Sequence, residues 1–316
     1  MTRSYRYLTL TVIVLLVASC AKREGVIDKK NRIEEVYAEE RHYQDNNLFH
    51  SIESYVEEDW HWDGKEMYRI DYRGEHPYSE NFFYGSHRCL ERTTVPAYNI
   101  RSEFFYDGRM LEHIDYYRDD EKYLTVTLLH DGKILTEIDC QYYSLSTESD
   151  SEAVAILHKR NPIAALLGAE VHSKLEAENT KRLAAQCKSG KGPMLTRYEL
   201  TWDGDNVSAI RCIDADGTRN IRLSYDDKRN PYRQLFGYRE ITDPLFGFEM
   251  LSENNITSIR MPYGRNANQL FTYRYEYDGD YPSKRTLTYS YQTISVFSFD
   301  SVMYKYEKEE RYVYDD

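Results

Sequence analysis

The chain has 316 residues, a formal net charge of −12, and 31 tyrosines against 11 phenylalanines. The excess of acidic residues excludes the basic surface that a nucleic-acid-binding protein needs. The length suits one large domain or two ordinary ones. The tyrosine content favours β-strands, because a Tyr ring covers a half-exposed sheet face while its hydroxyl group stays in water.

The first nineteen residues have the features of a signal peptide. Arg3 and Arg6 precede an apolar run over 8–17 that is too short for a spanning helix. The run ends in Val-Ala-Ser before Cys20, which resembles the bacterial lipobox, where signal peptidase II cleaves before the Cys and its thiol carries diacylglycerol. We therefore expect residues 1–19 to be removed and Cys20 to be lipidated, which leaves a net charge of −12 − 2 = −14. An ordinary signal peptide with an incidental Cys is the alternative.

An Asp-Gly pair between apolar runs recurs along the mature chain. The frame of Tyr198–Cys212 appears again at Trp60–Ile70, Phe104–Ile114 and Leu128–Ile138. Asp-Gly between alternating apolar residues predicts a tight β-hairpin, since both residues tolerate positive φ. Repeats of this size predict one hairpin unit set beside copies of itself.

Each of these repeats has an apolar residue four positions after the Asp and an Ile seven positions after it. A regular strand would point these two side chains to opposite faces. Either the strands are buried on both faces, or a bulge after the Gly brings the two residues onto one face.

The order of the predicted elements divides the chain. Residues 20–31 are polar and predict a tether, and a single β-repeat domain is expected over 32–316. Within it, Ala, Leu, Glu and Lys dominate at about 150–188, which predicts a helical insertion. Hairpins resume at Met194, and the last Asp-Gly copy has Pro282 and Arg285 in place of the two apolar markers.

We expect an all-β fold with a helical insertion, in which an antiparallel hairpin meander forms a curved half-barrel or barrel-like sheet. A β-propeller is the second choice, because pairs of hairpins could form four-stranded blades. A membrane-spanning barrel is disfavoured, because charges fall on both faces of the strands.

The recurring aromatic-Asp-Gly units resemble the YD-type hairpins of Rhs proteins. They resemble still more the repeat-bearing lipoproteins of unknown function in Bacteroidetes, including those with a porin-like curved sheet. The resemblance covers residues 60–143 and 194–291 together with the lipobox, and it implies no catalytic residues. Surface lipoproteins of that group often carry acidic residues after the lipidated Cys. Here Ala21-Lys22-Arg23 follows, which favours a periplasm-facing outer-membrane lipoprotein over surface display.

Four cysteines remain in the mature chain besides Cys20, and export makes disulfides possible. Cys140 and Cys212 both lie nine residues after a repeat Asp, so we expect two small buried residues in different hairpins rather than a bonded pair. The state of Cys89 and Cys187 stays open. No pair has the spacing of a zinc site.

Motifs for chemistry are few. Asp214-Ala215-Asp216-Gly217 opens like a calcium loop but lacks its later ligands, so a plain turn is expected. His61 and His130 are expected to lie at exposed strand ends. We predict no cofactor and no metal, and an enzyme is the less favoured alternative.

Three function classes follow. The first is a non-catalytic lipoprotein that is anchored to the membrane by its lipid and binds a glycan, a peptide or an envelope protein. The second is an envelope or polysaccharide hydrolase, and the third is a structural component of an outer-membrane complex. Alternation places tyrosines on single faces near the C-terminus, and an aromatic face suits a sugar or an extended chain. The candidate ligand-binding residues are Tyr273, Tyr275, Tyr277, Tyr289 and Tyr291. The competing interpretation is that these tyrosines are core.

Overall fold

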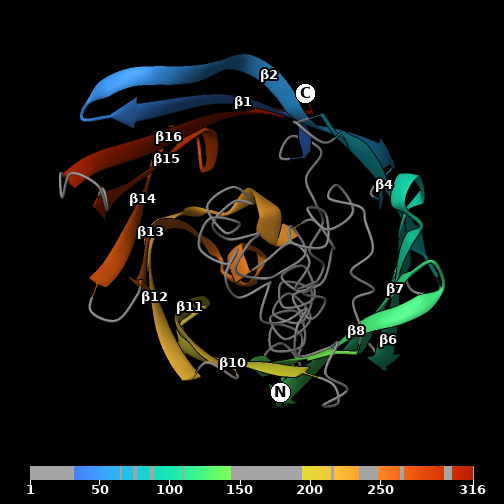
Figure 1. The fold of residues 1–316 in the computed structure, drawn as a ribbon. Coiled ribbons are helices and arrows are strands. Elements are labelled where there is room, and N and C mark those ends of the chain that lie inside the picture. The colour runs from blue at the N-terminus through green and yellow to red at the C-terminus, as the bar shows by residue number, and fades with distance from the viewer. Residues whose placement is uncertain are drawn as a thin grey trace, which may run out of the picture.

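The computed structural model describes residues 32–315 except 65, 74–76, 86–88, 109, 144–193, 215–216, 235–247, 264–266 and 295–300. The described residues form one antiparallel sheet of sixteen strands that closes into a barrel (Figure 1). The ring closes where β1 (Ile33–Gln44) pairs with β16 (Ser301–Tyr314). The predicted all-β antiparallel meander is confirmed. The sheet closes fully into a barrel, so the barrel-like alternative is correct and the half-barrel is not. One closed sheet also excludes a propeller of separate blades.

Apart from this closure, each strand pairs with the strand before it and the strand after it in the sequence. The strands between β1 and β16 are β2 (Asn47–Asp63), β3 (Glu66–Tyr72), β4 (Tyr78–Tyr84), β5 (Leu90–Val95), β6 (Ile100–Asp107), β7 (Met110–Arg118), β8 (Glu121–Asp131), β9 (Ile134–Tyr142), β10 (Met194–Asp203), β11 (Asn206–Asp214), β12 (Gly217–Arg229), β13 (Asn254–Tyr263), β14 (Ala267–Asp278) and β15 (Tyr281–Ile294). Among the described residues, three short 3-10 helices accompany them: η3 (Pro96–Tyr98), η4 (Pro231–Gln234) and η6 (Phe248–Leu251).

The two hairpin arrays belong to one sheet, because β9 pairs directly with β10 from Glu137↔Glu199 to Tyr142↔Met194. The predicted signal peptide, the tether and the helical insertion at 150–188 lie outside the described residues. Within the part of the chain that is described, no helix is long and apolar enough to cross a bilayer.

The Asp-Gly repeats form hairpins with a bulge. In the four matching copies Gly has φ between +59° and +63°, the left-handed conformation that glycine adopts without steric cost. The register of each hairpin then skips one residue of the second strand, which is Tyr68, Glu112, Thr136 or Ser208. Because of this bulge, the apolar residue and the Ile of each copy share one face, and all eight are at most 5% exposed. The bulge is thus the correct alternative.

Seven bulges of the described sheet have an aromatic partner on the neighbouring strand. Seven Tyr or Trp side chains donate a hydrogen bond to the carbonyl of the residue directly before a skipped position. The pairs are Trp62–Ile33, Tyr84–Met67, Tyr106–Leu90, Trp202–Leu135, Tyr225–Val207, Tyr275–Ile256 and Tyr314–Pro282, with distances of 2.7–2.9 Å. A bulge disrupts the ladder locally, and a buried carbonyl needs a donor. These bonds explain part of the high tyrosine content.

Loss of one such donor should be measurable. We expect Tyr275→Phe to lower the free energy of unfolding by about 1–3 kcal/mol, because the Ile256 carbonyl loses its side-chain donor. Tyr37→Phe is the matched control, since that hydroxyl group bonds Glu35 on the outer face, and its effect should stay within about 0.5 kcal/mol. Urea titration of both variants measures the difference, and equal effects would refute the structural role of the Tyr–carbonyl bond.

The two faces of the wall differ in polarity. The buried side chains face the interior of the ring, where Tyr232 of η4 packs against Trp60 of β2 and Tyr312 of β16. The opposite face of the strands carries ion pairs around the barrel. They include Arg41–Glu39, Arg69–Asp71, Arg101–Glu103, Lys122–Asp115, Arg197–Asp139, Arg211–Glu199, Lys284–Glu276 and Lys305–Glu307. The interior is therefore mainly apolar, and the exterior is charged.

Candidate functional site

One copy of the repeat places a charge at a core position. Arg285 lies seven residues after Asp278, where the other copies have a buried Ile. It points into the barrel beside Tyr232 and Tyr273, whose ring centroids each lie 5.8 Å from its guanidinium carbon. The exposed fraction of its side chain is 12%. A buried guanidinium group needs nearby carboxylates to offset its lost hydration.

The partners of Arg285 form an ion network across the seam where the barrel closes. Its Nη1 lies 2.5 Å from Glu249 of η6, and its Nε bonds Glu310 of β16. Lys308 Nζ lies 3.1 Å from Glu310 and 2.6 Å from Glu57 of β2. The network thus joins β15, β16 and β2, and it fixes η6 inside the ring.

The charges of this network stabilise one another. Burial alone would lower the pKa of Arg285, but Glu249 and Glu310 raise that pKa well above its ordinary range. Burial alone would raise the pKa of Glu310, yet Arg285 and Lys308 bring it down to about 2. Burial also opposes the charge of Lys308, whose pKa is nevertheless raised by Glu57 and Glu310. These three groups are therefore ionised at neutral pH.

Glu58 lies beside the network and behaves differently. Burial, followed by the charge of Glu57, raises its pKa to about 7, and the opposing hydrogen bond from the Trp60 indole is too weak to reverse this shift. The Trp60 Nε1 lies 3.0 Å from the Glu58 carboxylate. Glu58 is therefore protonated in part near neutral pH.

This shift predicts a pH-dependent stability. The folded protein binds the Glu58 proton more tightly than the unfolded chain does, because the pKa is raised from 4.5 to about 7. Protonation of Glu58 therefore stabilises the fold. This stabilisation is complete below pH 4.5 and is lost as the pH rises through about 7. We expect Glu58→Gln to stabilise the protein by about 1–3 kcal/mol at pH 8, and by much less at pH 5. Urea titrations at both pH values test this, with Glu121→Gln on the exposed start of β8 as control. A pH-independent effect of Glu58→Gln would contradict the shift.

Two of the predicted ligand-binding tyrosines, Tyr273 and Tyr289, line the interior of the barrel rather than its outer surface. Tyr273 is 8% exposed and Tyr289 is 3% exposed. The Tyr289 ring lies between Phe271 and Tyr306, at 5.4 and 5.1 Å. Their positions favour the core interpretation, and a ligand would have to enter the barrel to reach them.

The other members of that set are bonded or only partly described. Tyr275 and Tyr277 stack at 5.8 Å, so they share a face as expected, and the Tyr277 hydroxyl group donates to Asp226. Tyr291 lies opposite Tyr304 in the β15–β16 register, but its side chain is outside the described residues. Ligand binding by these tyrosines stays a prediction.

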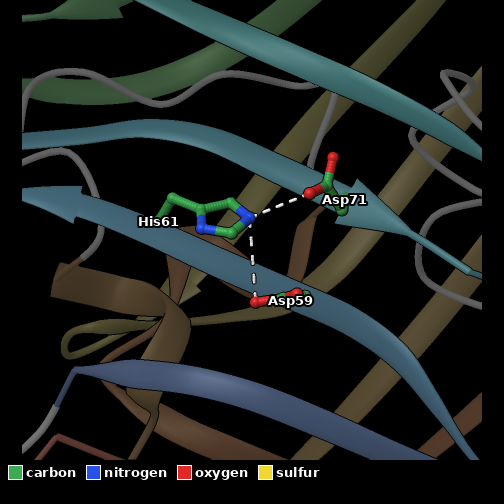
Figure 2. Close-up of side chains that lie close together, drawn as sticks. All are labelled: Asp59, His61 and Asp71. Atoms are coloured by element: carbon green, nitrogen blue, oxygen red, sulfur yellow. Dashed lines mark hydrogen bonds and ion pairs between the residues drawn. The ribbon is translucent and has the colours of Figure 1, made fainter.

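A second polar cluster lies on the outer face of β2 and β3. Figure 2 shows His61 directed at two carboxylates, with Nε2 at 2.9 Å from Asp71 and 3.7 Å from Asp59. The ligand atoms of the three residues lie within 4.8 Å of one another, as a divalent cation requires. His61 is therefore half-buried in a polar cluster, which corrects the expected exposed strand end. The signal that sequence reasoning missed is the Asp-Trp-His alternation, which sets Asp59 and His61 on one face.

The cluster already has its counter-charges. Arg73 lies 2.5 Å from Asp59, and Arg69 lies 2.7 Å from Asp71. Burial raises the pKa of Asp71, but hydrogen bonds from Ser79, His61 and Arg69 outweigh it and lower that pKa. Two guanidinium groups would repel a metal ion at this place. The geometry therefore supports a surface ion cluster that joins β2 to β3.

The prediction that Cys140 and Cys212 are small buried residues in different hairpins is confirmed. Cys140 of β9 and Cys212 of β11 are buried and are not bonded to each other, and Cys89 is buried as well. Cys140 and Cys212 lie on strands that flank β10, so each fills a core position in its own hairpin. Cys187 lies outside the described residues.

Comparisons with known proteins find matches among solved structures. Neither protein-family models nor curated protein sequences match the chain. Among solved structures, the chain is similar to a porin-like protein from Bacteroides uniformis, with 11% sequence identity and a TM-score of 0.46. The match covers 89% of this chain and 97% of that one. This similarity is too low to transfer a function, and membership among YD-repeat lipoproteins stays a prediction.

Proposed function

We propose that the protein is a lipid-anchored β-barrel of the outer membrane whose wall is exposed to water and not to lipid. The barrel faces the periplasm and binds a partner without catalysis. The anchor is the acylated Cys20, and the partner is a glycan, a peptide or an envelope protein. The observation that carries the proposal is the polarity of the wall. Its outward face bears charged pairs such as Arg197–Asp139 and Arg211–Glu199 at mid-strand.

A membrane-spanning barrel has the opposite arrangement. Its strands present an apolar band to lipid and a polar face to the lumen. Here the apolar residues Leu200 and Ile210 are buried inside, and Glu199 and Arg211 occupy the outside of the same strands. Placing such charges in lipid would cost about 2–4 kcal/mol for each Arg or Lys at the midplane. Membrane attachment then depends on the lipid.

The position of the chain ends supports this account. The five Asp-Gly hairpins of the repeat, at 63–64, 107–108, 131–132, 203–204 and 278–279, each join an even-numbered strand to the next odd-numbered one, so these turns lie at one end of the barrel. The start of β1 and the end of β16 lie at the same end, where the Asp315 amide donates to the Arg32 carbonyl. The tether would thus hold the Asp-Gly end towards the membrane. The opposite end remains free for a partner.

Fractionation tests the proposal. The full chain should enter the membrane pellet, and mass spectrometry should find diacylglycerol on an N-terminal Cys20. Replacing residues 1–20 by a cleavable signal peptide without a Cys should release the barrel into the soluble fraction. A barrel that stays in the pellet after an alkaline wash despite this replacement would contradict the proposal.

A hydrolase is the second candidate, and one observation favours it. Glu58 is partly protonated near pH 7, whereas Glu310 is ionised, and paired carboxylates of this kind can serve as acid and nucleophile. Glu310 is, however, bonded to both Arg285 and Lys308. If the candidate is correct, Glu58→Gln should abolish release of sugar from envelope polysaccharide while leaving the fold intact. Activity retained in that variant would exclude this pair.

A further inference from the structure

The β1–β2 hairpin forms an arm that extends beyond the ring of strands (Figure 1). β2 pairs with β3 only from Glu58 onwards, so among the described residues its stretch 47–56 pairs with β1 alone. All eight residues of Asn47–Ser54 are exposed. The free edge of β2 therefore presents backbone donors and acceptors to the surroundings. We call this stretch, Asn47–Val56, the β2 edge.

The β2 edge lacks the side chains that commonly protect edge strands. Native proteins commonly guard an edge with lysine, proline or inward charges. The stretch 47–54 has no lysine and no proline, and Glu53 is its one carboxylate. Three apolar side chains are exposed on it: Leu48 at 54%, Phe49 at 57% and Ile52 at 39%. An exposed edge of this composition favours pairing with another strand.

The sequence of the edge indicates which strand would pair with it. Leu48–Val56 reads LFHSIESYV, and its polarity pattern is the same in both directions about Ile52. Antiparallel pairing of two identical strands about a two-fold axis places each residue opposite its mirror position. With the axis at Ile52, Leu48 would face Val56 and Phe49 would face Tyr55. No like charges would lie directly opposite each other within this stretch.

We propose that a second copy of this chain binds the β2 edge, antiparallel and about a two-fold axis at Ile52. The register of β2 against β1 shifts at three places, but His50, Ser51 and Ile52 pair with β1 without interruption. A regular edge therefore lies at the axis, and apolar pairs flank it on both sides. The proposal names the partner for the binding role proposed above, and it places the contact at the end of the barrel away from the predicted anchor.

Site-specific cross-linking in membranes tests the proposal with the full-length lipoprotein. Residues directly opposite on antiparallel strands have Cβ atoms about 4.5–5.5 Å apart, close enough for a disulfide after small adjustments. Ile52→Cys should therefore give a covalent dimer under mild oxidation that reducing agent reverses. Leu129→Cys on the outer wall of β8, where Leu129 is 42% exposed, is the matched control and should give no covalent dimer.

A second variant excludes chance collisions. The detergent-solubilised wild type should have twice the mass of one chain by light scattering. Ile52→Lys should abolish the dimer, because two ammonium groups would face each other at the axis, whereas Ile52→Val should retain it. Since Ile52 is 39% exposed, both variants should keep the circular dichroism spectrum of the wild-type barrel. A monomeric wild type, or equal cross-linking of the two Cys variants, would overturn the proposal, whereas fractionation would still report separately on the lipid anchor.

Discussion

Replacement of Arg285 by methionine should destabilise the barrel by about 3–5 kcal/mol, the usual cost of removing one partner from a buried ion pair. The variant would leave Glu249 and Glu310 without their shared guanidinium. Its control is Arg211→Met, which removes an outer pair with Glu199 and whose Arg side chain is 54% exposed. We expect that control to cost at most about 1 kcal/mol.

The pH dependence of the Arg285 variant gives a second, independent measurement. The low pKa of Glu310 means that its ionised form stabilises the wild type above pH 4.5, and that this contribution is lost as the pH falls towards about 2. The difference between Arg285→Met and wild type should therefore narrow below pH 4.5. Adding Glu310→Gln to Arg285→Met should recover part of the stability at pH 7. A loss no larger than that of Arg211→Met would show that the network does not hold the seam.

Truncation of Tyr289 to alanine should cost about 3–5 kcal/mol, because the ring is buried between Phe271 and Tyr306. Tyr68→Ala removes a ring that is 47% exposed on the outer wall, and it should have little effect. Denaturant titration of both variants measures the difference. If Tyr289→Ala instead melted like the wild type and lost binding to a glycan or a partner, the ligand-platform interpretation would be correct and the core interpretation wrong.

The sequence predicted the local structure well because turn chemistry is local. Asp203-Gly204 and its copies identified the hairpins, and the odd spacing of Val207 and Ile210 restricted the choice to two arrangements. The bulge was one of these two arrangements. A sequence does not give the register of paired strands, which is what distinguishes the bulge from a strand buried on both faces. From the sequence alone, the aromatic residue next to the Asp indicates only a strand. Its bond to a neighbouring carbonyl becomes visible once the adjacent hairpin is placed.

The closure of the barrel depends on contacts between the two ends of the described chain. β1 and β16 pair from Ile33↔Tyr314 to Gln44↔Tyr304, and no sequence pattern links them directly. The interior network was also missed, although a signal existed. Arg285 occupies the repeat position that Ile70, Ile114, Ile138 and Ile210 fill elsewhere. A charge at a core position predicts a buried partner, but not which carboxylate it is, because Glu249 and Glu310 come from distant segments.

Accessibility of alternate residues on β10 tests the central claim, that the wall is apolar inside and water-facing outside. Thr201 lies on the exposed face of this strand, and the adjacent Leu200 is 8% exposed inside. In membrane fragments that carry the lipoprotein, a water-soluble maleimide should label Thr201→Cys rapidly and leave Leu200→Cys unlabelled until the protein is denatured. Protection of Thr201→Cys by the membrane, with labelling only after detergent is added, would contradict this account and indicate a barrel embedded in lipid.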